Sequence, residues 1–178
     1  LLKVAAEKPA IPADLNLVLI TIDTLRADLG FADNPRPVSP NLDKLAKASV
    51  VFERAYSLAS YTGKSVGPLL IGKYGSETHR NWGHSNTFGK EDTFLAERLQ
   101  KAGIHTMSAH SLRYFGKGTG LARGFDEVDL SAAGAEGSIK EMENTASANK
   151  LSDAALKLLA DPEATKGRFF LWVHYLDC

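Results

Sequence analysis

The stretch NLVLITI, Asn16 to Ile22, decides the fold of this 178-residue chain. It is an almost continuous apolar run rich in β-branched residues, which is typical of a strand that is covered on both faces. Strands of this kind occur in parallel sheets whose two faces carry helices. Asp23 follows immediately, so we expect the strand to end in a carboxylate.

Helical and strand-like segments alternate along the rest of the chain. The spacing of apolar residues predicts helices over residues 39–48, 65–74, 92–102 and 146–159. Further apolar runs predict strands over residues 50–56, 104–110 and 168–176. The glycine-rich residues 113–130 are expected to form a loop. The alternation predicts an α/β fold with a mostly parallel or mixed central sheet and helices on both of its faces.

The composition is that of an ordinary globular chain. Apolar residues make up 44% and charged residues 24% of the sequence, and Lys plus Arg equals Asp plus Glu at 21 each. A net charge of zero argues against nucleic acid as the main partner, and a single cysteine, Cys178, excludes an internal disulfide. No apolar run reaches membrane-spanning length. We expect residues 1–15 to be a linker or tether and residues 16–178 to form the folded unit.

The tripeptide Gly63-Lys64-Ser65 has the sequence that closes a phosphate-binding P-loop. The full motif needs a glycine five positions before Gly63, and that position is Leu58. A nucleotide site is therefore not expected here, and the residue of interest in this stretch is the preceding threonine, Thr62.

Polar side chains follow the predicted strands at the points where these end. Asp23 follows the first strand, the loop to Thr62 follows the second, His110 ends the third, and His174 and Asp177 come at the end of the last. Ligand sites of parallel sheets lie beyond the carboxyl ends of the strands. Carboxylate, hydroxyl and imidazole groups are therefore expected to gather at one edge, as in a metal-assisted site.

Several segments together resemble the N-terminal half of the sulfatase branch of the alkaline phosphatase superfamily. They are LVLITIDTLRADLG, SPNLDKLAKASVVFERAYS, DTFLAERLQKAGIHT, GLARGFDEVD and FFLWVHYLD, in this order within residues 16–177. The resemblance implies an α/β sandwich with a large mixed sheet. It also implies an enzyme in which a metal-bound hydroxyl nucleophile attacks the sulfur or phosphorus of an ester.

The resemblance assigns roles to single positions. Asp23 matches the aspartate that ligates the metal, and Thr24 stands where many sulfatases have a second aspartate. The LLIG segment, similar to the LLTG of the family, places Thr62 at the nucleophile, with Lys64 and Val66 in place of the usual Pro and Arg. Sulfatases convert a Cys or Ser at this point into formylglycine, which is not expected for threonine. The region instead resembles phosphoethanolamine transferases, which, like lipoteichoic-acid synthases, use an unmodified threonine.

These matches predict a divalent metal site, for Ca, Mg, Mn or Zn, with Asp23 and Thr62 as ligands and Thr62 as the catalytic nucleophile. Lys64, His110 and His174 are predicted to contact the substrate. Each residue also has a simpler explanation: Asp23 could cap a turn, Thr62 could cap a helix, Lys64 could be solvated, and the histidines could be structural. The remaining metal ligands of the family, an Asp-His or Asp-Asn pair, are expected outside this chain. We therefore expect the chain alone to be inactive and to bind metal weakly.

Three functions fit the sequence. The first is a metal-dependent sulfatase-like hydrolase that cleaves a sulfate or phosphate ester. The second is a transferase of a phosphoethanolamine- or phosphoglycerol-type group in the cell envelope, and the third is an inactive sulfatase-like binding protein, favoured by Thr24 and Val66. The resemblance implies a small-molecule, glycan or lipid ester as substrate and an extracytoplasmic location, either periplasmic or membrane-anchored through the parent protein. We also expect sheet edges and apolar surface of this chain to be uncovered.

Overall fold

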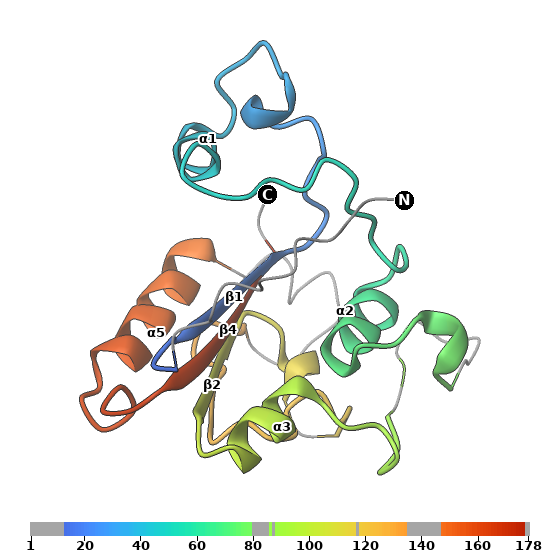
Figure 1. The fold of residues 1–178 in the computed structure, drawn as a ribbon, viewed down its shortest axis with the longest axis vertical. Coiled ribbons are helices and arrows are strands. Elements are labelled where there is room, and N and C mark those ends of the chain that lie inside the picture. The colour runs from blue at the N-terminus through green and yellow to red at the C-terminus, as the bar shows by residue number, and fades with distance from the viewer. Residues whose placement is uncertain (1–12, 80–85, 87, 117, 135–146, 177–178) are drawn as a thin grey trace, which may run out of the picture.

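The centre of the molecule is a four-stranded sheet in the order β1-β4-β2-β3, and every strand pair in it is parallel (Figure 1). The computed structural model describes residues 13–79, 86, 88–116, 118–134 and 147–176. The strands are β1 (Leu17–Ile22), β2 (His105–His110), β3 (Glu127–Asp129) and β4 (Phe169–Tyr175). The parallel sheet predicted from the apolar runs is confirmed.

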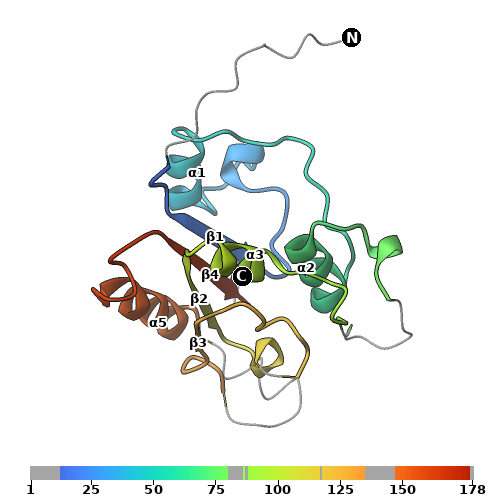
Figure 2. The same cartoon turned by 60° about the horizontal axis from the view of Figure 1, so that its bottom comes forward.

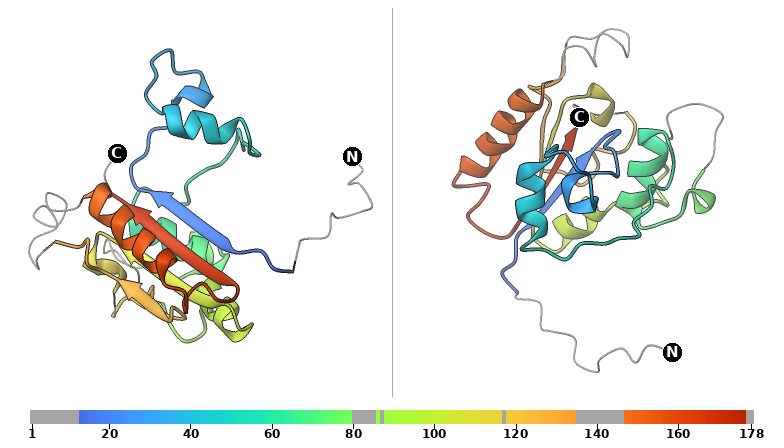
Figure 3. Two further views of the ribbon diagram at one scale, coloured as in Figure 1. Left: turned by 90° about the vertical axis from the view of Figure 1, so that its left-hand side faces the viewer. Right: turned by 90° about the horizontal axis from the view of Figure 1, so that it is seen from above.

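Helices cover both faces of this sheet, as predicted. The helix α5 (Ala148–Ala160) lies on one face, and α2 (Thr62–Ile71) and α3 (Leu95–Lys101) lie on the other (Figure 3). Because successive side chains of a strand point to opposite faces, Leu171 and Val173 of β4 pack in the core under α5. Phe170 and Trp172 of β4 belong to the core beneath α2 and α3.

The chain between β1 and α2 makes a long excursion away from the sheet. It contains a short 3-10 helix, η1 (Gly30–Ala32), and the helix α1 (Pro40–Ala46), both standing above the sheet (Figure 2). The strand predicted over residues 50–56 is wrong, because this segment is irregular and pairs with no strand among the described residues. Its large side chains, Phe52 and Tyr56, are 78% and 84% exposed. Apolar composition alone does not make a strand, because strand formation also depends on pairing with a neighbour and on burial of the side chains.

The strand β3 lies within the segment that we expected to be a loop. It has only three residues, Glu127–Asp129, which is too short to show alternation in the sequence. Its pairing with β2, from Met107 opposite Glu127 to Ala109 opposite Asp129, defines it. Two further 3-10 helices, η2 (Gly75–Glu77) and η3 (Arg113–Phe115), also escaped prediction.

The first helix of the core, α2, begins three residues before its predicted start and ends where the chain must turn. Gly72 follows the helix in a left-handed conformation, with φ of 68°, the geometry for which glycine is favoured after a helix. Its backbone N–H donates to Leu69 O. The early start places Thr62 inside the first turn of the helix.

One edge of the sheet is uncovered in the described part of the chain. β1 pairs only with β4, and Leu17, Val18 and Ile20 are between 45% and 57% exposed. This agrees with the expectation of uncovered apolar surface. Among the described residues, no helix is long and apolar enough to cross a membrane. The expected linker lies largely outside the described residues, as do Asp177 and Cys178.

Candidate active site

Three of the predicted site residues meet at the carboxyl end of the sheet. Thr62 Oγ1 donates a hydrogen bond of 2.5 Å to Asp23 Oδ2, and His174 Nε2 lies 3.7 Å from the same carboxylate oxygen. The three side chains come from the start of α2, the residue after β1 and the strand β4. The fold thus brings together a hydroxyl, a carboxylate and an imidazole that are distant in sequence.

The pairing of β1 with β4 fixes two of these groups. Thr21 stands opposite His174 and Ile22 opposite Tyr175, and the ladder continues one residue further because Asp23 N donates to Tyr175 O at 2.8 Å. A shift of one residue would turn these side chains to the opposite face. The positions of Asp23 and His174 are therefore set by the same register that builds the core.

A hydrogen-bonded chain holds the His174 ring. Trp172 Nε1 donates to Thr21 Oγ1 at 3.0 Å, and Thr21 Oγ1 lies 2.7 Å from His174 Nδ1. A hydroxyl has one proton to donate, and Thr21 can donate it to His174 Nδ1 in the tautomer that carries the ring proton on Nε2. His174 is 2% exposed, and its Nε2 makes no hydrogen bond within the described residues. In this tautomer, His174 presents a buried N–H beside Asp23.

The surroundings of Asp23 favour its charged form. The His174 imidazole lowers the pKa of Asp23 most, the Thr62 hydroxyl and the Thr24 backbone N–H lower it further, and partial burial opposes them. Thr24 itself has a left-handed backbone, with φ of 52°, which is unusual for a β-branched residue. The site is therefore built around an ionised carboxylate.

Thr62 is the first residue of α2 and does not cap it. The N-cap position belongs to Tyr61, whose carbonyl accepts from Lys64 N at 3.0 Å and from Ser65 N at 2.9 Å, and no side chain caps the helix. The simple explanation of Thr62 as a capping residue is thus wrong, since its hydroxyl is bonded to Asp23.

A cleft of about 480 Å³ opens at this point. Asp23, Thr62 and His174 line it, together with hydroxyl side chains that the sequence patterns did not single out as site residues, namely Thr21, Ser57, Ser60, Tyr61 and Ser65. The Ser57 and Ser65 hydroxyls are 2.9 Å apart. The cleft therefore offers several hydroxyl groups that can donate to oxygen atoms, beside apolar side chains such as Val66 and Leu69.

The geometry agrees with a comparison against protein families, in which the model named Sulfatase matches residues 15–178. The chain belongs to the sulfatase family. The predicted membership of the sulfatase branch of the alkaline phosphatase superfamily is confirmed. The chain is 33% identical over 99 residues to an arylsulfatase of Clostridium perfringens, and the match covers 51% of this chain. It is also 33% identical over 107 residues to an ulvan-active sulfatase of Formosa agariphila, covering 60% of this chain.

Solved structures support the same fold. The chain matches a protein solved in complex with its substrate D-glucosamine-2-N,6-O-disulfate, with a TM-score of 0.72, 17% identity and 91% coverage of this chain. It also matches the C-terminal periplasmic domain of EcEptC from Escherichia coli in complex with Zn, with a TM-score of 0.64, 19% identity and 92% coverage. The chain spans 34% and 43% of these two structures and 19% and 20% of the two sulfatases.

Lys64 and His110, the other two predicted substrate contacts, lie outside the described lining of the cleft in this sulfatase-family chain. The Lys64 ammonium lies 5.8 Å from the centre of the Tyr61 ring. His110 is 1% exposed and packs 4.8 Å from Phe115 and 4.5 Å from Trp172, between ring centres. Burial, reinforced by the nearby His174, lowers the pKa of His110 to about 3. His110 is therefore a neutral core residue, and any contact of either side chain with substrate stays a prediction.

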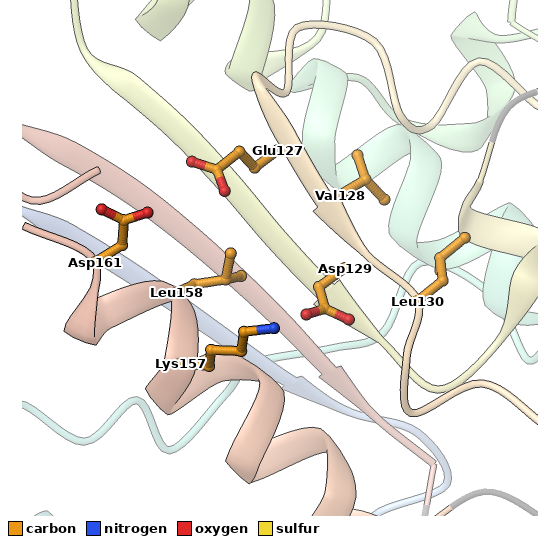
Figure 4. Close-up of a pocket in the computed structure, with 7 residues that line it drawn as sticks. All are labelled: Glu127, Val128, Asp129, Leu130, Lys157, Leu158 and Asp161. Atoms are coloured by element: carbon orange, nitrogen blue, oxygen red, sulfur yellow. The ribbon is translucent and has the colours of Figure 1, made fainter. Parts of the chain in front are cut away.

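A second depression of about 400 Å³ lies between β3 and α5 (Figure 4). Its lining carries three carboxylates, of Glu127, Asp129 and Asp161, and the Lys157 ammonium. It shares no residue with the cleft at Thr62. Its described lining holds no hydroxyl, thiol or imidazole, so it does not offer the hydroxyl nucleophile that is predicted for the ester chemistry of the family.

The donor set at Asp23 fits a divalent metal only in part. The carboxylate and the Thr62 hydroxyl supply two adjacent oxygen ligands of the kind that Mg²⁺, Ca²⁺ and Mn²⁺ prefer. Within the described ranges, no group of three or more His, Cys, Asp or Glu could hold a metal ion.

Proposed function

We propose that the protein is a metal-dependent, sulfatase-like hydrolase that cleaves a sulfate or phosphate ester with Thr62 as its nucleophile. The observation that carries the proposal is the 2.5 Å hydrogen bond from Thr62 Oγ1 to the ionised Asp23. Family membership supports a sulfuric ester hydrolase. The threonine supports attack by an unmodified hydroxyl.

Asp23 and Thr62 have different roles in the proposed cleavage of the ester. Asp23 orients the Thr62 hydroxyl through its hydrogen bond, and a divalent metal held by these two residues would favour the alkoxide, as it lowers the pKa of bound water. The bond from Thr62 Oγ1 to sulfur or phosphorus forms as the bond to the ester oxygen breaks. The alcohol leaves with a proton, and water then cleaves the ester on Thr62.

Two further features suit a negatively charged group at this point. The free N–H groups in the first turn of a helix, together with the helix dipole, attract anions, and α2 begins at Thr62. In the tautomer with its proton on the buried Nε2, His174 can donate a hydrogen bond to an ester oxygen. Neutral imidazole is sufficient for this role.

The test uses the complete protein, aryl sulfate and aryl phosphate esters, and buffers with and without a chelator. Thr62→Ala should lower kcat by about 1,000-fold or more, as loss of a covalent nucleophile does, whereas Thr62→Ser should keep measurable turnover. Mass spectrometry of the quenched reaction should find sulfate or phosphate on Thr62. Undiminished turnover by Thr62→Ala would refute the role of the threonine.

A transferase is the second candidate, because the nucleophile is a threonine where sulfatases usually carry Cys or Ser. The same covalent enzyme would then pass its group to an acceptor alcohol instead of water. Adding a glycan or lipid alcohol distinguishes the two, since a transferase makes the new ester and a hydrolase releases free sulfate or phosphate. An inactive binding protein would bind the ester and do neither.

The location and the substrate class are also proposals. One structural neighbour is named as a periplasmic domain and another as holding a disulfated glucosamine. We infer by analogy an extracytoplasmic enzyme that acts on a glycan or other small ester, with Lys64 and His110 as further contacts once substrate is bound. Fractionation of cells with an antibody against the protein tests the location.

A further inference from the structure

The helix α2 carries two glycines on one face. Gly63 and Gly67 are four residues apart and both are buried, and residues at this spacing lie one above the other on a helix. Neither has a positive φ, so neither is needed for a left-handed turn. A glycine inside a helix costs about 0.5–1 kcal/mol relative to alanine. Their presence therefore calls for a reason other than backbone conformation.

The reason is space for two aromatic side chains. A Cβ atom at Gly63 would overlap the Tyr114 hydroxyl oxygen and lie 3.1 Å from Tyr114 Cζ. A Cβ atom at Gly67 would overlap Phe88 Cζ and lie 2.6 Å from Cε2. Each glycine thus admits one ring, and the two contacts are one helical turn apart.

The Tyr114 ring also packs against an aromatic residue of the core. It belongs to η3, shortly after β2 ends, and its ring packs edge-on against Phe115 with 5.3 Å between centres. Phe115 is fully buried and lies 4.6 Å from the His174 ring. The Tyr114 hydroxyl therefore connects the first turn of α2 with the aromatic residues that surround His174.

We propose that Tyr114 is a positioning residue for the nucleophile: its hydroxyl, seated in the space that Gly63 leaves, sets where the first turn of α2 stands and so keeps Thr62 against Asp23. The inference rests on the proposed function, because it gives Thr62 the role of nucleophile. Thr62 directly precedes Gly63, and its 2.5 Å hydrogen bond to Asp23 leaves little room for displacement. Displacement of a reacting group by about 1 Å can cost about 100-fold in rate.

The second glycine supplies a matched control. Gly67→Ala creates an overlap of the same kind with Phe88, but one turn further from Thr62. Both substitutions exchange a buried glycine for alanine in one helix, so their general effects on folding should be similar. Only Gly63→Ala should disturb the contact between Thr62 and Asp23.

The experiment compares Gly63→Ala, Gly67→Ala, Tyr114→Phe and the double variant of Gly63 and Tyr114 in the complete protein. For an aryl ester, Gly63→Ala should lower kcat by about 100-fold with KM changed less than about 3-fold, the pattern of lost positioning. Tyr114→Phe alone, which removes the oxygen without an overlap and keeps the fold, should lower kcat by about 3- to 10-fold. Gly67→Ala should lower the urea midpoint as much as Gly63→Ala but change kcat by less than about 3-fold.

Rescue gives the decisive readout. Removal of the tyrosine oxygen leaves Cζ at 3.1 Å from the new methyl group, a distance that small shifts can accommodate, so the double variant should regain at least about 10-fold in kcat over Gly63→Ala. Equal loss of kcat in Gly63→Ala and Gly67→Ala, or no rescue by Tyr114→Phe, would overturn the positioning role. An unchanged kcat in Tyr114→Phe would also count against it.

A failure of the proposed function can be told apart from a failure of the positioning role of Tyr114. If the unaltered protein cleaves neither ester, crystal structures of the same variants decide the inference. The separation of Thr62 Oγ1 from Asp23 Oδ2 should then exceed hydrogen-bond distance in Gly63→Ala, stay short in Gly67→Ala, and shorten again in the double variant. An unchanged separation in Gly63→Ala would refute the positioning role independently of any activity.

Discussion

The strands β1 and β4 lie side by side and are similarly apolar, yet their surroundings differ. Phe170 and Trp172 of β4 are fully buried, because β4 has a strand on either side and helices above and below. Val18 and Ile20 of β1 are 48% and 57% exposed, because β1 is an edge of the described sheet. An apolar run shows that a strand is suited to burial, but it does not show which neighbour covers it.

The candidate site takes one group from each of these strands, and the groups differ in the same way. Asp23, which follows the edge strand, has a side chain 23% exposed and carries charge, whereas His174 of β4 is 2% exposed. Burial of a charge is costly unless it is paired, while a hydrogen-bonded neutral ring is tolerated. The edge strand can therefore supply the ionised group, and the interior strand can supply a fixed N–H.

The largest expected effect is a loss of stability on truncating a buried side chain of the interior strand β4. Trp172→Ala in the 178-residue chain should lower the free energy of unfolding by about 3–5 kcal/mol, because a large side chain is removed from a packed core and Thr21 loses its donor. Ile20→Ala in β1 should cost less than about 1 kcal/mol, since much of its side chain is already solvated. Urea denaturation followed by circular dichroism measures both.

Measuring Trp172→Ala and Ile20→Ala in a longer form of the protein would test whether β1 stays exposed there while β4 is buried. If another segment covers β1 there, Ile20→Ala should become about as costly as a core truncation, about 2–5 kcal/mol. A small effect of Trp172→Ala in either form would show that the core around β4 is less tightly packed than the structure indicates.

A smaller effect, on the pH dependence of stability, is expected from His110, the last residue of the interior strand β2. Burial lowers its pKa from 6.5 to about 3 in the folded state, so below pH 6.5 the unfolded chain binds a proton that the folded chain does not. The stability due to His110 is thus complete above pH 6.5 and is lost as the pH falls towards 3. The slope from this one group is at most about 1.4 kcal/mol per pH unit.

The difference between the unaltered chain and His110→Phe isolates this contribution, because other groups titrate in both. Phenylalanine suits a site between Phe115 and Trp172. The unfolding free energy of His110→Phe should therefore depend less steeply on pH between 6.5 and 4 than that of the unaltered chain. Parallel pH profiles of the two proteins would mean that His110 is protonated or solvated in the folded state.

The sequence predicted most of the interior and the helix α1, but it missed other peripheral segments. The runs that became β1, β2 and β4 are long enough to show their character, as are the helices α2 and α5. The expected strand over residues 50–56 did not form, since strand formation depends on a partner that a local pattern cannot supply. The short strand β3 is defined by its pairing with β2, so its local sequence did not predict a strand.

The site was foreseeable to the extent that it lies at strand ends. Asp23 and His174 follow from the rule that ligands bind beyond the carboxyl ends of parallel strands, and Thr62 from the family resemblance. Ser57 and Tyr114 could not be foreseen, because one lies in an irregular segment and the other contacts α2 only through the folded path of the chain. Burial of His110 likewise depends on packing by distant aromatic residues.

The smallest expected effect lies at the exit from the edge strand. Thr24 adopts a left-handed backbone with φ of 52°, which costs a β-branched residue about 1–2 kcal/mol, and its backbone N–H helps to keep Asp23 ionised. Glycine adopts this conformation without strain and keeps the N–H, although it makes the unfolded chain more flexible. Thr24→Gly should therefore raise the free energy of unfolding by up to about 1 kcal/mol, whereas the isosteric Thr24→Val, which keeps the strain, should not. A loss of stability in Thr24→Gly would mean that the contacts of the threonine side chain outweigh the strain, and that the turn after β1 is held by its side chain rather than tolerated for the sake of Asp23.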